Sequence, residues 1–254
     1  MSMTDQELAQ KAISLLDLTN LNDDCTPADI ETLCAKAQTP YGNTAAICIW
    51  PRFIPQAKEL LNGTGIKIAT VVNFPAGGED VAGVVEETKQ ALTDGADEID
   101  LVVPYKCWLE GRRGYTETMI VRVREAIPAP AKLKTILETG ELKDEAIIRE
   151  VSDMAIEAGA DFIKTSTGKV KVNATPEAAE VMIEAIAQSG RSVGFKPAGG
   201  VRSLEDAGAY LAIADKYMGA DWAKPETFRF GASGVLDALL AAMEGKIEQA
   251  GEGY

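Results

Sequence analysis

The sequence predicts an α/β protein whose single domain is a (β/α)₈ barrel, the TIM-barrel architecture. Eight short apolar runs alternate with longer segments of helical period along the 254 residues. No linker, low-complexity tract or block of charge divides the chain, and eight strand–helix units in about 250 residues match such a barrel. An open doubly wound sheet is the alternative, but no Gly-x-Gly-x-x-Gly follows the first apolar run. We therefore expect one barrel domain over residues 1–254, ending in a flexible tail at about 248–254.

The eight predicted strands are runs of four to seven mostly apolar residues, as expected for buried parallel strands. They cover, in chain order, Leu15–Thr19, Ala45–Trp50, Ile66–Val72, Glu98–Val103, Lys132–Leu137, Asp161–Thr165, Ser192–Lys196 and Phe228–Gly231. Side chains alternate along a strand, so a Lys164 that points inward brings Phe162 and Ser166 with it. Gly194 shares a face with Lys196, and we expect it to leave room at the barrel centre for substrate or another side chain.

The segments between the strands carry signals for the beginning and end of helices. The helical period is clearest over Gly83–Asp94, Asp144–Ala158, Pro176–Ser189 and Ser203–Met218. Thr175 and Ser203 stand where helix N-caps are needed. Gly95, Gly159 and Gly219 each follow a helix, and we expect them to supply left-handed C-terminal caps.

Composition excludes several classes of function. The net charge of −14 and the pI of about 4.6 disfavour nucleic-acid binding. No segment approaches the roughly 20 apolar residues of a membrane span, and Met1–Gln10 is too polar for a signal peptide. The four cysteines have no Cys-x-x-Cys spacing and the chain has no histidine, so we expect reduced thiols, a cytoplasmic location, no metal and no cofactor. Composition alone leaves an all-oxygen magnesium site open.

Two lysines are the strongest candidates for chemistry. Lys164 lies in Asp161-Phe162-Ile163-Lys164-Thr165-Ser166-Thr167-Gly168-Lys169, and Lys196 lies in Gly194-Phe195-Lys196-Pro197-Ala198-Gly199-Gly200. Both end a strand, where barrel active sites are found. Burial or a nearby cation lowers the pKa of a lysine, and the neutral amine can attack a carbonyl to form a Schiff base. The alternatives are a lysine that reaches solvent and a simple phosphate ligand.

A third candidate is Asp100, which stands between Ile99 and Leu101 in an apolar strand. A lone buried carboxylate is costly, so this residue needs a partner. A proton shuttle beside the lysine and a structural ion pair are both open interpretations.

Three small loops at strand ends predict a phosphate site. They are Thr165–Lys169, Pro197–Arg202 and Phe230–Gly234, and the last two follow the seventh and eighth predicted strands. Barrels often bind phosphate at these two positions, on backbone N–H groups. Tight turns without a ligand are the alternative. The first loop lacks the leading glycine of a nucleotide-binding P-loop. Cys48, in another strand, is read mainly as a small core residue.

These motifs resemble those of the deoxyribose-phosphate aldolases, a family of class I aldolases. The resemblance covers nearly the whole chain and is densest in Asp17–Thr19, Gly42–Ile49, Pro51–Pro55, Glu138–Leu142, Gly159–Lys169 and Gly194–Arg202. It implies a metal-independent barrel enzyme of carbohydrate catabolism. The implied reaction is the reversible cleavage of 2-deoxy-D-ribose 5-phosphate to acetaldehyde and D-glyceraldehyde 3-phosphate.

The resemblance also implies roles for individual residues. Lys164 matches the Schiff-base lysine, Lys196 the lysine that perturbs it, and Asp100 the carboxylate of a proton relay. Tyr254 matches a C-terminal tyrosine that helps to move a proton. The matched pocket and phosphate positions are Asp17, Thr19, Cys48, Thr167, Gly168, Lys169, Gly199, Gly200, Gly231, Ser233 and Gly234.

One departure from the family concerns Gly234, which stands where a second serine is common. The lost hydroxyl predicts a weaker preference for phosphorylated aldehydes. The implied partners are small aldehydes and phosphosugars, with a homodimer as a further expectation. Two other functions stay open from the residues alone: a phosphosugar isomerase in which Lys164 binds phosphate, and a sugar-phosphate-binding protein without catalysis.

Overall fold

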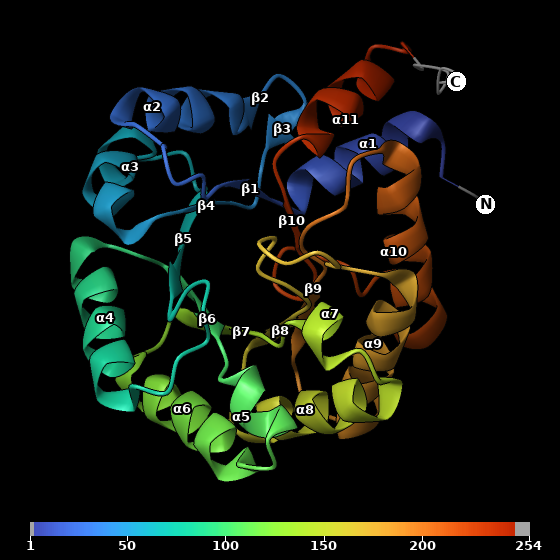
Figure 1. The fold of residues 1–254 in the computed structure, drawn as a ribbon. Helices are drawn as coiled ribbons and strands as arrows, with labels where there is room; N and C mark the ends of the chain where they lie inside the picture. Colours follow the sequence, from blue (N-terminus) through green and yellow to red (C-terminus); the bar gives the residue numbers. More distant parts are fainter. Residues whose placement is uncertain (1–2, 247–254) are drawn as a thin grey trace.

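Eight parallel strands surrounded by helices form a barrel in the computed structural model of the protein, which describes residues 3–246 (Figure 1). The predicted fold class is therefore confirmed. The strands are β1 (Leu16–Asn20), β4 (Ala46–Ile49), β5 (Lys67–Val72), β6 (Glu98–Val102), β7 (Lys132–Ile136), β8 (Phe162–Lys164), β9 (Gly194–Lys196) and β10 (Phe230–Ala232). The expected tail at about 248–254, with Tyr254, lies outside the described residues.

Neighbouring strands pair in parallel in the order β10-β1-β4-β5-β6-β7-β8-β9. Between β9 and β10 the ring is completed by two bridges, Phe195 with Phe228 and Ala198 with Gly231. All strands therefore end on the same side, where the connecting loops form the mouth of the barrel.

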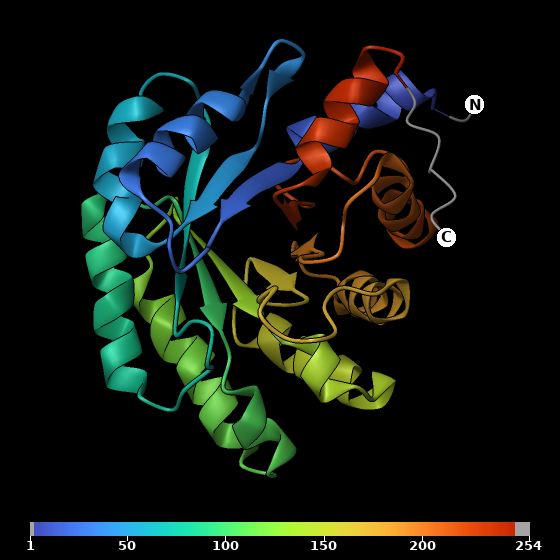
Figure 2. The ribbon, with the colours of Figure 1, turned by 45° about the horizontal axis from the view of Figure 1, so that its top comes forward.

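The helices lie around the strands in chain order. They are α1 (Asp5–Ser14), α2 (Pro27–Lys36), η1 (Pro51–Phe53), α3 (Ile54–Leu60), α4 (Val81–Asp94), α5 (Tyr105–Leu109), α6 (Arg113–Ala126), α7 (Thr139–Leu142), α8 (Glu145–Glu157), α9 (Pro176–Ser189), α10 (Leu204–Met218) and α11 (Val235–Met243). The first helix, α1, precedes the barrel and packs against α11 (Figure 2). A hairpin of β2 (Gln38–Thr39) and β3 (Gly42–Asn43) was not predicted, because strands of two residues leave no apolar run.

Most predicted helix ends are confirmed. The Thr175 side chain accepts the N–H of Ala178, and Ser203 forms a capping box with Asp206. Gly95 is left-handed at φ 116° and ψ 22°. The prediction for Gly219 is wrong in detail: its φ of 90° still favours glycine, but its ψ of 155° lies outside the left-handed helical region.

Apolar and charged side chains occupy opposite faces of several strands of the barrel. Residues that face the helices are apolar and fully buried, such as Ile99, Leu101 and Ile163. Five strands, β1, β6, β7, β8 and β9, also bury a charged side chain, so the centre of this barrel is not the usual stack of aliphatic side chains. That exception marks the site.

Candidate active site

Seven charged side chains fill the centre of the barrel, and none of them is more than 5% exposed. Three are carboxylates and four are bases. They are Asp17 on β1, Glu98 and Asp100 on β6, Lys134 on β7, Lys164 on β8, Lys196 on β9 and Arg229 just before β10. We call this set the charged cluster.

The two lysines singled out in the sequence meet at one carboxylate oxygen. Lys164 and Lys196 are register partners on adjacent strands. Their Nζ atoms donate to Oδ2 of Asp100 at 2.7 Å and 2.8 Å. The chain thus brings together three of the four residues for which a catalytic role is expected; the fourth, Tyr254, lies outside the described residues. Asp100 is an ion-pair partner in this geometry and also lies where a proton can pass between the lysines.

The environments of the two lysines differ. Burial lowers the pKa of Lys164, and Lys196 lowers it further, which together outweigh the attraction of Asp100. Burial also acts to lower the pKa of Lys196, but Asp100 and Asp17 outweigh it and raise that pKa. The second contact, from Lys196 Nζ to Asp17 Oδ2, is 2.5 Å long. Lys164 is therefore the amine that most readily becomes neutral, and Lys196 stays an ammonium.

Sequence reasoning missed the other side of the cluster. Lys134 donates to Glu98 and, at 3.1 Å, to Asp100 Oδ1. The Arg229 guanidinium donates from Nη1 to Asp17 Oδ1 at 2.6 Å and from Nη2 to Glu98 Oε1 at 2.7 Å. A signal was available, because Glu98 and Asp100 are two residues apart and so share a face of one buried strand.

Phe162 explains the glycine on the next strand. Its ring centroid lies 5.9 Å from Lys134 Nζ and 5.8 Å from Arg229 Cζ, so it faces inward as predicted. A Cβ on Gly194 would lie 2.3 Å from this ring. The space left by Gly194 is therefore taken by another side chain, one of the two uses that the sequence suggested.

Above the cluster, a cavity of about 760 Å³ opens at the carboxyl ends of the strands. The side chain of Lys164 lines it. So do these predicted pocket and phosphate positions: Thr19, Thr167, Gly168, Lys169, Gly199, Gly200, Gly231, Ser233 and Gly234. Asp17 and Cys48 do not line it. Asp17 belongs to the charged cluster, and Cys48 is fully buried beside Leu21, Ala69 and Val71.

Several features of the cavity wall suit an anion. Lys169 projects from its loop toward Asp23, whose carboxylate is largely exposed and 3.7 Å away. Gly199 has a φ of 77°, and a Cβ there would lie 2.8 Å from Asn173. Gly234 is the N-cap residue of α11, and it has no side chain that could accept from the first N–H groups of the helix. These N–H groups are therefore available to an anion.

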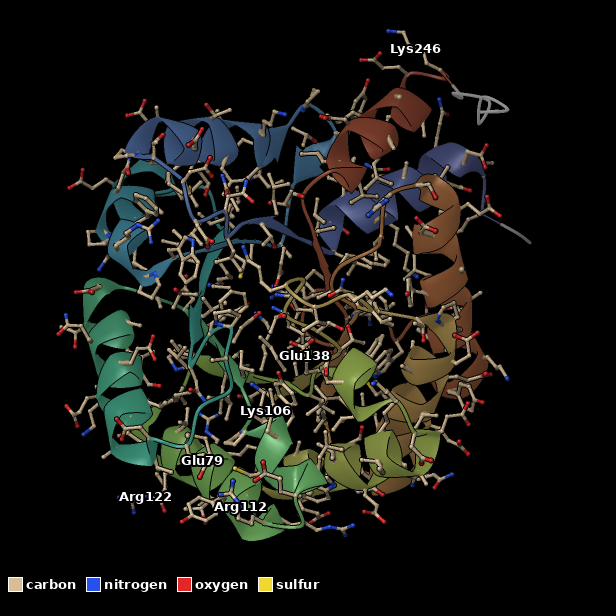
Figure 3. The ribbon with its side chains drawn as sticks, in the orientation of Figure 1. Glu79, Lys106, Arg112, Arg122, Glu138 and Lys246 are labelled. Carbon is tan, nitrogen blue, oxygen red and sulfur yellow. The ribbon has the colours of Figure 1, made fainter. Side chains whose placement is uncertain are left out.

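Glu138 is a further residue of the mouth that the sequence indicated only through its motif. It lies beside α7 over the barrel centre (Figure 3), fully buried and with a left-handed φ of 59°. Its Oε1 accepts the N–H of Thr167 at 3.1 Å, and burial raises the pKa of its carboxyl. Next to it, a Cβ on Gly140 would lie 1.9 Å from the carbonyl oxygen of Val172. Glu138 and α7 therefore hold the loop that follows Lys164.

Residues 3–246 contain neither a metal-binding cluster nor a membrane-spanning helix. No group of three or more His, Cys, Asp or Glu side chains there is arranged to hold a metal ion. Within the same range, no helix has the length and apolar character needed to cross a membrane.

Comparison with known proteins gives one family. Residues 11–236 match the sequence model of the DeoC/LacD family aldolases. A deoxyribose-phosphate aldolase of Agrobacterium fabrum (strain C58 / ATCC 33970) is 58% identical over 251 residues, covering 98% of this chain and 97% of that protein.

Solved structures agree with the sequence comparison. The apo form of a protein assigned as a deoxyribose-phosphate aldolase, from Toxoplasma gondii ME49, has a TM-score of 0.86 at 25% identity, covering 95% of this chain and 97% of that one. The tetrameric deoxyribose phosphate aldolase of Aeropyrum pernix has a TM-score of 0.75 at 25% identity, covering 94% and 92%.

Proposed function

The chain belongs to the DeoC/LacD family of class I aldolases, and we propose that it catalyses the reversible cleavage of 2-deoxy-D-ribose 5-phosphate to acetaldehyde and D-glyceraldehyde 3-phosphate. The observation that carries the assignment of roles is the asymmetry of the two lysines at Asp100. One amine, Lys164, has a lowered pKa and faces the cavity, while the other, Lys196, is held as a cation behind it.

In the synthetic direction, the lone pair of neutral Lys164 Nζ attacks the carbonyl carbon of acetaldehyde. The resulting carbinolamine takes up a proton and loses water, which leaves an iminium. Asp100 lies within hydrogen-bond distance of this nitrogen, and Lys196 donates to the same carboxylate oxygen. The two residues are proposed to accept and supply the protons.

Loss of a proton from the methyl carbon of the iminium gives a neutral enamine. The enamine carbon attacks the aldehyde carbon of D-glyceraldehyde 3-phosphate, and the new alkoxide takes a proton. Water then hydrolyses the second iminium, which frees the product and the Lys164 amine. Tyr254, which lies outside the described residues, is proposed to assist the transfer of the methyl proton, on the strength of the family resemblance.

We propose that the phosphate of the acceptor is bound by Lys169 and by backbone N–H groups of the loops that contain Gly199, Gly200 and Ser233. Support comes from their position on the cavity wall with Lys164. A charged ligand on backbone N–H groups forms the stronger, charge-assisted kind of hydrogen bond. Thr19 is proposed to line the other side.

The state and location of the protein are also proposals. The proposed cytoplasmic location is consistent with the four free, buried thiols, and a homodimer is proposed as its state. The Aeropyrum pernix relative is a tetramer, so sedimentation of this chain at micromolar concentration would decide its own state.

Trapping of the Schiff base tests the proposed function. The protein is incubated with acetaldehyde and sodium cyanoborohydride, and its peptides are analysed by mass spectrometry. One ethyl group is expected on Lys164, and none there after Lys164→Leu. Lys171→Leu, which removes an exposed lysine of the same loop, is the matched control and should be trapped as wild type is. An isomerase or a non-catalytic binding protein would give no specific label at Lys164.

A further inference from the structure

We propose that Glu98, Lys134 and Arg229 are positioning residues for the aldolase reaction. With Asp17, Asp100 and Lys196 they form a buried set of three carboxylates and three cations whose charges cancel. No carboxylate charge is then left over to hold a proton on Lys164. The proposal rests on the proposed function, in which Lys164 attacks as a neutral amine. None of the three residues lines the cavity. Their effect therefore has to pass through the charges of the cluster.

The cations and anions of the charged cluster are unequal in number. The cluster contains four bases and three carboxylates, all buried within one barrel. An uncompensated charge is costly in a region of low dielectric constant, so the cluster is most stable with equal numbers of cations and anions. With the carboxylates ionised, one of the four bases has to give up its proton.

The contacts of the four bases show which of them gives up its proton. Three of the bases contact at least two carboxylates each: Lys134 contacts Glu98, Asp100 at 3.1 Å and Asp17 at 3.3 Å; Lys196 contacts Asp17 at 2.5 Å and Asp100 at 2.8 Å; Arg229 contacts Asp17 at 2.6 Å and Glu98 at 2.7 Å. Lys164 contacts Asp100 alone, through an oxygen that Lys196 also uses. It is thus the base whose proton the cluster loses at least cost.

Other titratable groups near Lys164 do not alter the balance. Cys48 approaches from β4, and Glu138 follows β7. Burial raises the pKa of both groups, which favours their uncharged forms. Neither forms an ion pair with a base among residues 3–246. The charges that remain are those of the cluster itself.

The test uses variants that change the cluster charge in opposite directions. Arg229→Gln removes a cation, and Glu98→Gln removes the carboxylate that it contacts at 2.7 Å. The double variant restores equal numbers. Arg229 contacts neither Lys164 nor Asp100 among the described ion pairs, so its effect on Lys164 cannot come from a lost contact. The measurement is the rate at which acetaldehyde and cyanoborohydride label Lys164, followed as a function of pH. The pH is varied from about 5.5 to about 9, roughly the interval in which perturbed amines lose their proton.

The expected shifts follow from the sign of the charge change. Arg229→Gln leaves a surplus anion, which favours a proton on Lys164 and moves the pH of half-maximal trapping up by at least about one unit. Glu98→Gln leaves a surplus cation and moves the pH of half-maximal trapping down. In the double variant this pH returns toward the wild-type value. If Arg229→Gln does not fold, as judged by circular dichroism, Lys134→Met removes the same charge and is expected to shift in the same direction.

The outcomes separate this inference from the proposed function. Wild-type protein that is not trapped at Lys164 would refute the function. Wild-type protein that is trapped, with cation and anion variants that shift the same way or not at all, would overturn the inference alone. A purely structural role predicts that the double variant is worse than either single variant, whereas charge balance predicts recovery.

Discussion

The centre of the barrel and its mouth both manage charge, but they do so with different groups. At the centre, side chains from five strands and from Arg229 pair with one another, away from solvent. At the mouth, loops rich in glycine line the cavity, and the pair of Lys169 with Asp23 is partly exposed. Under the proposed function, side-chain charge at the centre governs the reactivity of Lys164, whereas Lys169 and backbone N–H groups at the mouth govern the affinity for phosphate.

The two regions also differ in energetic scale. Removal of one partner from a buried ion pair costs about 3–5 kcal/mol, because the other charge is left uncompensated. A neutral hydrogen bond at the mouth contributes only about 0.5–1.5 kcal/mol, and one to a charged group about 1.5–3 kcal/mol. Variants at the centre should therefore have the larger effect, and it should appear in kcat. Variants at the mouth should have a smaller effect, which should appear in KM.

The largest effect is expected for Lys196→Met. Without Lys196, Oδ2 of Asp100 is left to Lys164, and the pKa of Lys164 rises toward that of free lysine. Near neutral pH the neutral fraction, and with it kcat, then falls about tenfold for each unit by which the pKa rises. The activity lost should return in part as the pH is raised through the new pKa. A pH–rate profile measures this, with the surface variant Lys216→Met as control; a wild-type profile for Lys196→Met would contradict the role of the centre.

At the mouth, Lys169→Met should raise KM for 2-deoxy-D-ribose 5-phosphate while leaving Lys164 reactive. The loss of one charge-assisted contact to phosphate, about 1.5–3 kcal/mol, corresponds to roughly a tenfold to hundredfold change. Trapping with acetaldehyde, which has no phosphate, should proceed at the wild-type rate. A decrease in that trapping rate would show that the two regions are not separable at this residue.

Gly234→Ser should have a smaller effect. No atom lies within 4 Å of a Cβ at this position, and its φ of −79° suits any residue, so the serine fits without strain. Its hydroxyl adds one donor to a charged acceptor that the backbone already contacts, so we take the lower end of the range for such bonds, about 1.5 kcal/mol. The preference for phosphorylated over unphosphorylated aldehydes should then improve by roughly tenfold. Competition between D-glyceraldehyde 3-phosphate and D-glyceraldehyde measures the preference. An unchanged ratio would count against any role of this position in specificity.

The smallest effect is expected for Glu138→Gln, because the side chain keeps its shape and can still accept the Thr167 N–H. The exchange of the buried acid for an amide changes only how firmly the loop is held, which should weaken phosphate binding by no more than about threefold. KM for the phosphorylated substrate is the expected readout, with kcat nearly unchanged. Glu141→Gln, on the same short helix, is the matched control. A large loss of kcat with unchanged KM would place Glu138 with the centre instead of the mouth.

The sequence predicted the mouth and only part of the centre, for a physical reason. Loops at strand ends are marked locally by Gly, Ser and Thr, so each could be recognised without knowledge of its neighbours. Lys134 and Arg229 are ordinary basic residues in their own segments. Their importance arises from partners 36 and 131 residues away, on other strands. The local pattern of Glu98 and Asp100 showed that charge faced inward, but the pairing could be read only once the ring of strands was closed.

Gly231 lines the mouth but lies against a residue of the centre, and it fits there because its side chain is a single hydrogen. A Cβ at that position would lie 3.0 Å from Cε of Lys196 and 2.9 Å from Cβ of Ala198. Substrate redesign that randomises the loop after β10 would therefore displace Lys196, and through Asp100 the proposed Schiff-base residue Lys164, whenever residue 231 is included. Libraries aimed at new acceptor aldehydes should vary positions 233 and 234 and keep 231 fixed, so that selectivity can be altered without a hidden loss of turnover.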